Sequence, residues 1–412
     1  MPANELSVRP LTEADMDRFL EVDNIAFLEG PSAPEMAAWQ RRFLETDRSI
    51  GVFDGRTQVG GASIFTMRLT VPEGRQVPMA GVTWVSMLPT HRRRGGLKKM
   101  MRHQLDTLHE TGAEPVAGLT ASHPAIYGRY GYGCATFAAS LTIPRERNGL
   151  RLPPGTDDVT LRLVDPKSAI EICKEKYSRH VLLRPGMLEK PDWWYEYDAS
   201  DLPEMRGDQS SLRLVLAERD GVPVGYATYR TKATGPGYEG EVIVRGVYAD
   251  DPAAYAALWR MLLNVDLAKA IVVDPAIPID DPLLQMLESL RYANPTIRDR
   301  LHIRLVDVSR ALAARTYTAP IDVVFEVVDE FCPWNAGRWR LVGDEKGASC
   351  ERTDSAADLT VDVRELGAIY LGGVTLRALA AAGQVGEHTT GAVPAVSRAF
   401  ASDVQPWLPL GI

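Results

Sequence analysis

The sequence predicts two successive α/β domains of one plan, followed by a third domain of α+β character. Three observations support this prediction. The chain has 412 residues, which is enough for two or three domains of ordinary size. A strand–turn–strand pattern at residues 54–62 recurs, one residue shorter, at 220–227. The pattern changes again near Pro295. The predicted domain ranges are 1–150, 151–295 and 296–412.

Composition places the chain among soluble, intracellular proteins. Hydrophobic residues make up 45% of the chain and charged residues 24%, values that are ordinary for a globular protein. No stretch approaches the roughly 20 apolar residues of a membrane helix, and no secretory signal is visible. The net charge of −8 argues against a nucleic-acid partner and favours cationic substrates. Four cysteines lack metal-ligand spacing, so we expect free thiols, no metal and a cytoplasmic location: Cys134, Cys173, Cys332 and Cys350.

The sequence predicts the order of helices and strands in the first domain. Apolar spacing predicts helices at 13–27 and 34–46, strands at 50–53, 59–67 and 82–88, a helix from residue 97, and a strand at 115–120. Asp54 and Gly55 mark a hairpin between two of these strands. A segment rich in glycine and tyrosine, residues 122–133, follows the last strand as a short helix or turn.

Residues 82–99 place an apolar strand, a basic glycine turn and a helix start in one stretch. The turn contains Arg92, Arg93, Arg94, Gly95 and Gly96. Backbone N–H groups that point one way into a helix N-terminus bind anions, because the unpaired donors and the helix dipole act together. The arginines add positive charge, and the glycines let the main chain approach phosphate oxygens. The stretch therefore predicts a pyrophosphate site, with a solvated surface turn as the alternative.

The second domain repeats the predicted order of strands and helix, but its turn before the helix is acidic instead of basic. A strand at 242–248 and a helix around Trp259 follow its hairpin, yet Asp250 and Asp251 stand where the first copy is basic. Because carboxylates repel a pyrophosphate, we expect this copy to lack the phosphate site. For the third domain we expect strands at 300–308, 323–328 and 339–342 and helices at 374–382 and 394–402.

These motifs carry a family resemblance over the whole chain. Residues 82–99 resemble the acetyl-CoA motif of the GNAT acetyltransferases, with a departure from its pattern at Leu97. Residues 89–95 and 126–133 are more closely similar to the Eis acetyltransferases of actinobacteria, and residues 357–373 resemble their sterol-carrier-like part. The resemblance implies tandem GNAT-like domains, with mixed, mostly antiparallel sheets flanked by helices, and a C-terminal α+β domain like sterol carrier proteins.

The resemblance also implies a coenzyme site for acetyl-CoA as cosubstrate. Backbone amides of Val85, Ser86 and Met87 would bond the pantetheine arm, with one N–H facing the developing oxyanion. The pyrophosphate would be held by Arg92, Arg93, Arg94, Gly95, Gly96, Leu97 and Lys98. Ser122 matches a further coenzyme contact, and its neighbour His123 stands where relatives usually have glutamate.

Two catalytic groups follow from the same resemblance. Tyr127 matches the general acid of the family, and a phenol with a pKa of about 10 is protonated at neutral pH and able to protonate a thiolate. From the residues alone, Tyr130 and Tyr132 remain alternatives, and any of the three can be a packing residue. The implied base is the C-terminal carboxylate, here that of Ile412, acting through water or on an amine of lowered pKa. Relatives commonly end in an aromatic residue.

The implied activity is acetyl transfer to amines, by direct attack on the thioester in a ternary complex. The resemblance suggests aminoglycosides acetylated at more than one position and a homohexameric assembly. Trp39 and Trp84 are candidate walls of the acceptor pocket, because aromatic faces attract cationic amines, or else packing residues. Two alternatives remain: a protein-lysine acetyltransferase, and a non-enzymatic carrier that binds acetyl-CoA or a lipid.

Overall fold

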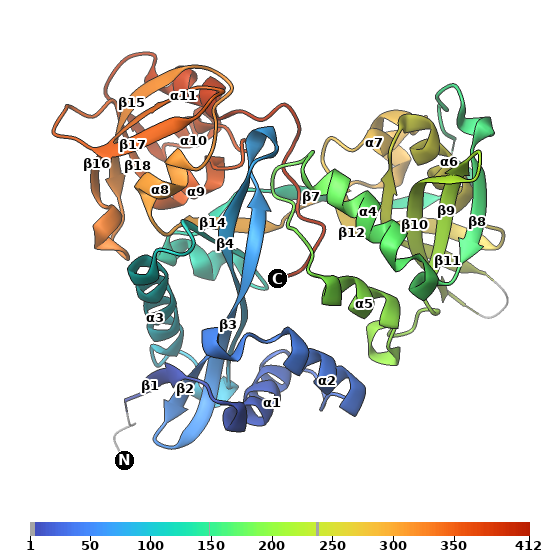
Figure 1. Ribbon diagram of the computed structural model, residues 1–412, viewed down its shortest axis with the longest axis horizontal. Coiled ribbons are helices and arrows are strands. Elements are labelled where there is room, and N and C mark those ends of the chain that lie inside the picture. Colours follow the sequence, from blue (N-terminus) through green and yellow to red (C-terminus); the bar gives the residue numbers. More distant parts are fainter. Residues whose placement is uncertain (1–4, 148, 236–238) are drawn as a thin grey trace. The chain divides into compact units, whose positions relative to one another are not determined.

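The computed structural model describes residues 5–147, 149–235 and 239–412. The chain divides into two compact units (Figure 1). The first unit contains the chain up to Thr136, Arg300–Pro406 and Leu410–Ile412, and the second contains Phe137–Asp299 and Trp407–Pro409.

A seven-stranded mixed sheet forms the centre of the first unit. Its strands are β1 (Ser7–Pro10), β2 (Ile50–Asp54), β3 (Thr57–Thr70), β4 (Gln76–Met87), β5 (Val116–Thr120), β6 (Gly133–Cys134) and β14 (Leu301–Leu305). They lie in the order β1-β2-β3-β4-β5-β14-β6. β4 and β5 run parallel, and the other neighbours run antiparallel. This arrangement confirms the mixed, mostly antiparallel sheet that was expected.

Helices cover both faces of this sheet. They are α1 (Met16–Ala26), α2 (Pro34–Phe43) and α3 (Gly96–Thr111). Val52 of β2 packs in one buried cluster with Met100 of α3, whereas Phe53 packs in another with Phe19 of α1. Because successive residues of a strand point to opposite faces, α1 and α3 lie on opposite sides of the sheet.

The position of β14 corrects one expectation. The strand expected at 300–308 was assigned to the third domain, but β14 lies inside the first sheet, between β5 and β6. All of its residues are buried, including His302 and Arg304. Polar and apolar residues alternate along β14 as in a half-exposed strand, yet Arg304 points to a buried partner, Asp329.

The second unit repeats the plan of the first. Its strands are β7 (Phe137–Pro144), β8 (Thr160–Val164), β9 (Arg213–Arg219), β10 (Val222–Ala233), β11 (Gly240–Ala249), β12 (Ala268–Pro278) and β13 (Thr296–Asp299), in the order β13-β7-β12-β11-β10-β9-β8. Its helices are α4 (Ile170–Val181), α5 (Asp192–Ser200), α6 (Pro252–Leu263) and α7 (Pro282–Met286). The β9–β10 hairpin and the parallel pair β11–β12 correspond to β2–β3 and β4–β5.

The helix that follows β11 begins differently from α3. The carboxylate of Asp251 accepts hydrogen bonds from the N–H groups of Ala253 and Ala254, each at 2.9 Å. It also forms an ion pair with Arg219 at 2.8 Å. The chain's own acid therefore occupies the N-terminus of α6, where an anion would otherwise bind.

The C-terminal part of the chain forms a separate five-stranded sheet in the first unit. Its strands are β15 (Ile321–Val328), β16 (Gly337–Gly343), β17 (Ala348–Arg352), β18 (Leu359–Asp362) and β19 (Val385–Glu387), in the order β17-β16-β15-β18-β19. The helices are α8 (Val308–Ala313), α9 (Val363–Ile369), α10 (Leu376–Ala381) and α11 (Ala392–Phe400). The α+β character expected for the third domain is confirmed.

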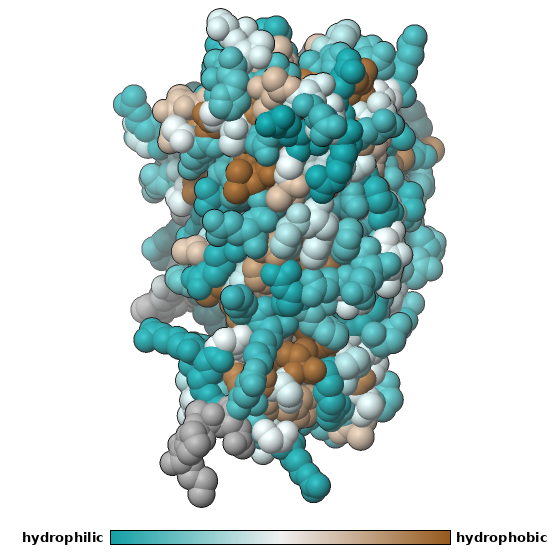
Figure 2. Space-filling model, turned by 90° about the vertical axis from the view of Figure 1, so that its left-hand side faces the viewer, coloured by the Kyte–Doolittle hydropathy of each residue, from teal (hydrophilic) through white to brown (hydrophobic). Residues whose placement is uncertain are grey.

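The surface is mostly polar where Figure 2 shows it, with apolar side chains in small, separate groups. Within the described ranges, no helix has the length and apolar character needed to cross a membrane.

Candidate active site

Strands β4 and β5 pair over only part of their length. The parallel pairing ends at Gly81 and Gly118, yet β4 continues to Met87 and β5 to Thr120. β3 occupies the other edge of β4. In the part of the chain that the structure describes, the edge of β4 beyond Gly81 therefore has no strand against it. Because backbone N–H and C=O groups need partners, such an edge is suited to an extended ligand.

A bulge shapes this open part of β4. The register with β3 shifts at Trp84, which has a φ of 55°. A bulky residue rarely adopts this conformation, which persists only where the surrounding structure holds it. The Trp84 ring lies 6.1 Å from the ring of Phe19 on α1. Bulges redirect side chains and are common beside binding sites. The three residues expected to contact pantetheine follow directly on the open edge: Val85, Ser86 and Met87.

Helix α3 begins with backbone N–H groups that have no acceptor. Gly95 is the N-cap residue, with a φ of 84° that favours glycine. Among the described residues, no backbone or side-chain acceptor takes the N–H groups of Gly95, Gly96, Leu97 and Lys98. Together with the helix dipole, these donors form a site for an anion. A Cβ at Gly96 would lie 2.9 Å from the Sδ and Cε atoms of Met87, so the flexible end of that side chain would have to move.

Two arginines of the turn bind other parts of the protein. Arg92 donates to the carbonyl oxygens of Met87 at 3.4 Å and Ala26 at 3.3 Å. Arg94 Nη1 donates to Asp54 Oδ2 at 2.9 Å. Arg92 thus fixes the turn to the end of α1, and Arg94 fixes it to the β2–β3 hairpin. A phosphate that binds Arg94 would compete with the Asp54 carboxylate.

Tyr127 lies on the short 3-10 helix η5 (Pro124–Tyr130), which follows β5. Its side chain is 9% exposed, and its hydroxyl makes no hydrogen bond to the described residues. Burial, with a smaller contribution from Tyr130, raises the pKa of Tyr127 to about 12. The phenol therefore stays protonated at neutral pH and has a proton to donate.

The two other tyrosines of this segment have different surroundings. Tyr132 is fully buried, and its hydroxyl oxygen is enclosed without a partner. The Tyr130 ring packs edge-on against Phe331, with ring centres 5.0 Å apart. Tyr132 is thus enclosed, whereas Tyr127 and Tyr130 each pack edge-on against another ring, Tyr127 against Tyr132 at 6.1 Å.

The chain ends beside β5. The Thr120 hydroxyl donates to a terminal carboxylate oxygen of Ile412, and the Ile412 N–H donates to Thr120 Oγ1 at 3.2 Å. Arg300 Nη2 donates to the Leu410 carbonyl at 3.1 Å and holds the preceding turn of the tail. Thr120 is the last residue of β5, so the terminal carboxylate lies at the end of β5 from which η5 and Tyr127 continue.

The other residues predicted to belong to the site lie further from the open edge of β4 or have other contacts. Ser122 and His123 are exposed between β5 and η5. Trp39 lies on α2, where its ring is 5.7 Å from that of Phe43 and the Arg42 guanidinium lies 4.8 Å from its centre. One face of Trp39 is therefore already occupied by a cation of the protein, and Trp84 is the aromatic residue on the open strand.

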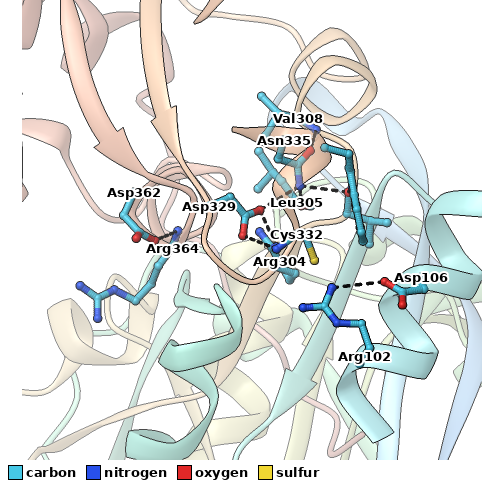
Figure 3. Close-up of polar contacts among 12 residues, drawn as sticks. Arg102, Asp106, Arg304, Leu305, Val308, Asp329, Cys332, Asn335, Asp362 and Arg364 are labelled. Atoms are coloured by element: carbon cyan, nitrogen blue, oxygen red, sulfur yellow. Dashed lines mark hydrogen bonds and ion pairs between the residues drawn. The ribbon is translucent and has the colours of Figure 1, made fainter. Parts of the chain in front are cut away.

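A buried ion pair that no sequence motif marks lies in the same unit (Figure 3). Arg304 Nη2 donates to Asp329 Oδ2 at 2.6 Å, and the two side chains are 0% and 1% exposed. Asn335 Nδ2 donates to the same oxygen at 3.0 Å, and the Cys332 N–H donates to Oδ1 at 2.8 Å. The partners are far apart in sequence, so spacing alone does not indicate their contact.

The loop of residues 329–335 links the C-terminal part to both segments of the candidate site. Phe331 contacts Tyr130 of η5, and the Trp334 ring stacks 4.3 Å from that of His109 on α3. The ion pair thus anchors a loop that supports η5 and α3 together.

We expect Arg304→Ala to lower the free energy of unfolding by about 3–5 kcal/mol, because it leaves the Asp329 carboxylate buried without its cation. Urea unfolding measures the change. Arg338→Ala is the matched control: its ion pair with Glu326 is 45% and 36% exposed, so a loss of about 0–1 kcal/mol is expected. Equal losses in the two variants would contradict the assigned role of Arg304.

Family models match three successive parts of the chain. Residues 7–135 and 186–305 each match an acetyltransferase (GNAT) domain, and residues 308–409 match a sterol carrier protein domain. The order of the three matches agrees with the two related sheets and the separate α+β part seen in the structure.

Full-length relatives agree with these matches. A Streptomyces avermitilis protein named uncharacterized N-acetyltransferase is 49% identical over 92% of this chain and 93% of its own. The N-acetyltransferase Eis of Mycobacterium tuberculosis is 36% identical over 90% of this chain and 91% of its own. The crystal structure of Eis1 from Mycobacterium abscessus aligns with a TM-score of 0.83 at 34% identity, covering 99% of this chain and 100% of that one.

Proposed function

Because the chain belongs to the Eis family of GNAT N-acetyltransferases, we propose that it transfers the acetyl group of acetyl-CoA to primary amines, aminoglycosides among them. We propose that the catalytic part comprises the chain up to Thr136 together with β14, instead of residues 1–150. The second GNAT-like part, proposed to lack a phosphate site, is Phe137–Asp299, and the proposed sterol-carrier-like part follows β14 and would end in a catalytic carboxylate.

One arrangement carries this proposal. The open edge of β4 begins where β4 and β5 separate, and the unpaired N–H groups at the start of α3 follow the other end of this edge. The Tyr127 segment and the Ile412 carboxylate lie at the end of β5, and all four belong to the first unit. A coenzyme arm bound along β4 would have its pyrophosphate at α3 and its thioester beside β5. A carrier protein needs neither a phenol nor a carboxylate there.

The residues of the chain would bind and orient the coenzyme. The N–H groups of Gly95 to Lys98 would hold its pyrophosphate, and the edge from Val85 to Met87 would pair with its pantetheine arm. One N–H of that edge would stabilise the negative charge on the carbonyl oxygen. Acetyl-CoA supplies an activated acyl carbon and a thiolate leaving group.

Two groups at the end of β5 would donate and accept the protons of the reaction. The amine nitrogen bonds to the acetyl carbon, and the carbon–sulfur bond breaks. Tyr127 donates its proton to the leaving sulfur. The carboxylate of Ile412 accepts, through water, the proton that nitrogen loses as the new bond forms. Both groups are then restored by exchange with solvent.

The proposed acceptors are small cationic amines, in keeping with the net charge of −8. The proposed assembly is a homohexamer acting in the cytoplasm. Light scattering checks the assembly, with six times the 45.3 kDa chain mass as the expected result.

Gly95→Ala should weaken acetyl-CoA binding about tenfold, because an L-residue resists the left-handed conformation by about 1–2 kcal/mol and the turn would relax. Calorimetric titration with acetyl-CoA measures the dissociation constant. Gly391→Ala is the matched control, since Gly391 is also a left-handed N-cap residue with no atom within 4 Å of a Cβ. Its effect on coenzyme binding should be negligible, and an equal effect would argue against a phosphate site at α3.

The activity is tested by following thiol release from acetyl-CoA with three classes of acceptor: aminoglycosides, aliphatic polyamines and lysine-containing peptides. We expect turnover with the first two classes and acetylated amine in the mass spectrum. Turnover with peptides alone would favour a protein-lysine acetyltransferase. No turnover with any primary amine, despite tight coenzyme binding, would favour a carrier.

A further inference from the structure

The end of the Tyr127 segment lies against the guanidinium group of Arg304. Gly131 is the C-cap residue of η5, and a Cβ placed on it would lie 2.8 Å from Cζ and Nη1 of Arg304. The backbone of Gly131 is therefore in direct contact with the guanidinium group. The Gly131 N–H donates to the Gly128 carbonyl at 3.0 Å, which closes the last turn of η5 at this contact.

The guanidinium group is itself held in place. Arg304 is fully buried on β14, where its Nη2 donates to Asp329 Oδ2 at 2.6 Å (Figure 3). The Asp329 carboxylate is fixed in turn, because it also accepts from the Cys332 N–H and from the Asn335 side chain. A lysine ammonium could bind Asp329 but would not fill the space that the planar group occupies against Gly131.

A second path leads from the same ion pair to η5. The loop of residues 329–335, which the ion pair anchors, reaches η5 through Phe331, whose ring packs edge-on against Tyr130 with ring centres 5.0 Å apart. The Tyr127 ring packs edge-on against the buried Tyr132 at 6.1 Å. All four rings belong to one buried cluster. Because no described residue bonds the Tyr127 hydroxyl, the packing of its ring decides where this hydroxyl points.

We propose that Arg304 is a positioning residue for the acid: held by Asp329, it fixes the end of η5 and keeps the Tyr127 hydroxyl directed at the leaving sulfur. This inference rests on the proposed function. Arg304 is fully buried, so it contacts neither coenzyme nor acceptor, and no proton passes through it. Through Asp329, the C-terminal part of the chain thus contributes to acid catalysis.

The test compares Arg304→Lys with Arg315→Lys. Arg315 is the matched control, because it is also fully buried in the first unit and its guanidinium donates to three backbone carbonyl groups of the C-terminal part. For Arg304→Lys we expect kcat to fall about tenfold, because the acid is misplaced, while KM for acetyl-CoA and for the amine stays within twofold. Arg315→Lys should lower the thermal unfolding midpoint as well, but leave kcat per folded molecule within twofold.

A double-mutant cycle separates positioning from a general loss of structure. In the Tyr127→Phe background the acid is already absent, so Arg304→Lys should change kcat by less than twofold there. Single-turnover thiol release measures these slow variants. A tenfold fall in both backgrounds, no fall in either, or an equal fall in Arg315→Lys would overturn the role of Arg304.

Two further measurements cover the remaining outcomes. If Arg304→Lys does not fold, Phe331→Leu replaces it: loss of the ring contact with Tyr130 should lower kcat about threefold with Tyr127 present and not in the Tyr127→Phe background. An unchanged kcat would overturn the inference. If the wild type acetylates no amine, the proposed function fails instead, and hydrogen exchange of residues 124–132 tests the positioning alone. Faster exchange in Arg304→Lys than in the wild type and Arg315→Lys supports it, and equal exchange overturns it.

Discussion

Tyr127→Phe is expected to lower kcat at least 100-fold while leaving the dissociation constant of acetyl-CoA within twofold. The variant keeps the ring and its edge contact with Tyr132 and removes only the hydroxyl proton. Steady-state thiol release measures kcat, and calorimetric titration measures coenzyme binding. Because burial raises the pKa of Tyr127 to about 12, its ionisation should not reduce wild-type turnover between about pH 7 and pH 10.

Tyr130→Phe is the matched control for this prediction. Tyr130 lies three residues away in the same 3-10 helix, and its ring packs against Phe331. Removal of its hydroxyl should leave kcat within about threefold of the wild type. If Tyr130→Phe were the variant that lost turnover, the acid would be assigned to the wrong tyrosine.

Appending one alanine after Ile412 should lower kcat about 10- to 100-fold, the second large effect that we expect. One added residue displaces the terminal carboxylate by about 3.5 Å, and a 1 Å misplacement of a reacting group is enough to cost about 100-fold. The thermal unfolding midpoint should change little, because the tail keeps its Arg300 contact. Thiol release with a good amine acceptor measures the effect.

Ile412→Leu keeps the carboxylate at its position and changes only the apolar side chain, so it serves as the control for the extended chain. We expect turnover close to that of the wild type. If the extended chain and Ile412→Leu were equally active, the terminal carboxylate would have no part in proton transfer.

The sequence predicts well those elements that depend on residues close together in the chain. The strand, turn and helix around residues 82–99 follow one another within a single short stretch, so propensity and spacing suffice to place β4, the Gly95 turn and α3. The repeated hairpin signal at 220–227 likewise predicts the second sheet. In the structure, Asp220 and Gly221 both adopt positive φ there. These signals depend on a few neighbouring residues and need no knowledge of distant contacts.

Contacts between segments that are far apart in the sequence are harder to predict. The alternating pattern of β14 predicts a strand but not its sheet, since the burial of Arg304 depends on Asp329, 25 residues further along. Periodicity along α1 marks Phe19 as a core residue, but the approach of Asp23 to Ser86 requires the packing of α1 on β4.

The catalytic roles of Tyr127 and Ile412 are assigned from local sequence motifs together with contacts between distant segments. From the residues alone, Tyr127, Tyr130 and Tyr132 are equivalent, and only their different burial and contacts in the fold separate them. The position of Ile412 beside Thr120 is likewise a tertiary contact, which an apolar tail with two prolines only suggests. These assignments stay predictions until the variants are measured.

Hydrogen–deuterium exchange with and without acetyl-CoA tests the central claim most directly, namely that the coenzyme lies along the open edge of β4 with its pyrophosphate at α3. We predict slower exchange in residues 82–87 and 95–98 when acetyl-CoA is bound, and no change at residues 391–394, where Glu387 already accepts from two N–H groups. Unchanged exchange in both coenzyme segments at saturating acetyl-CoA would contradict the account.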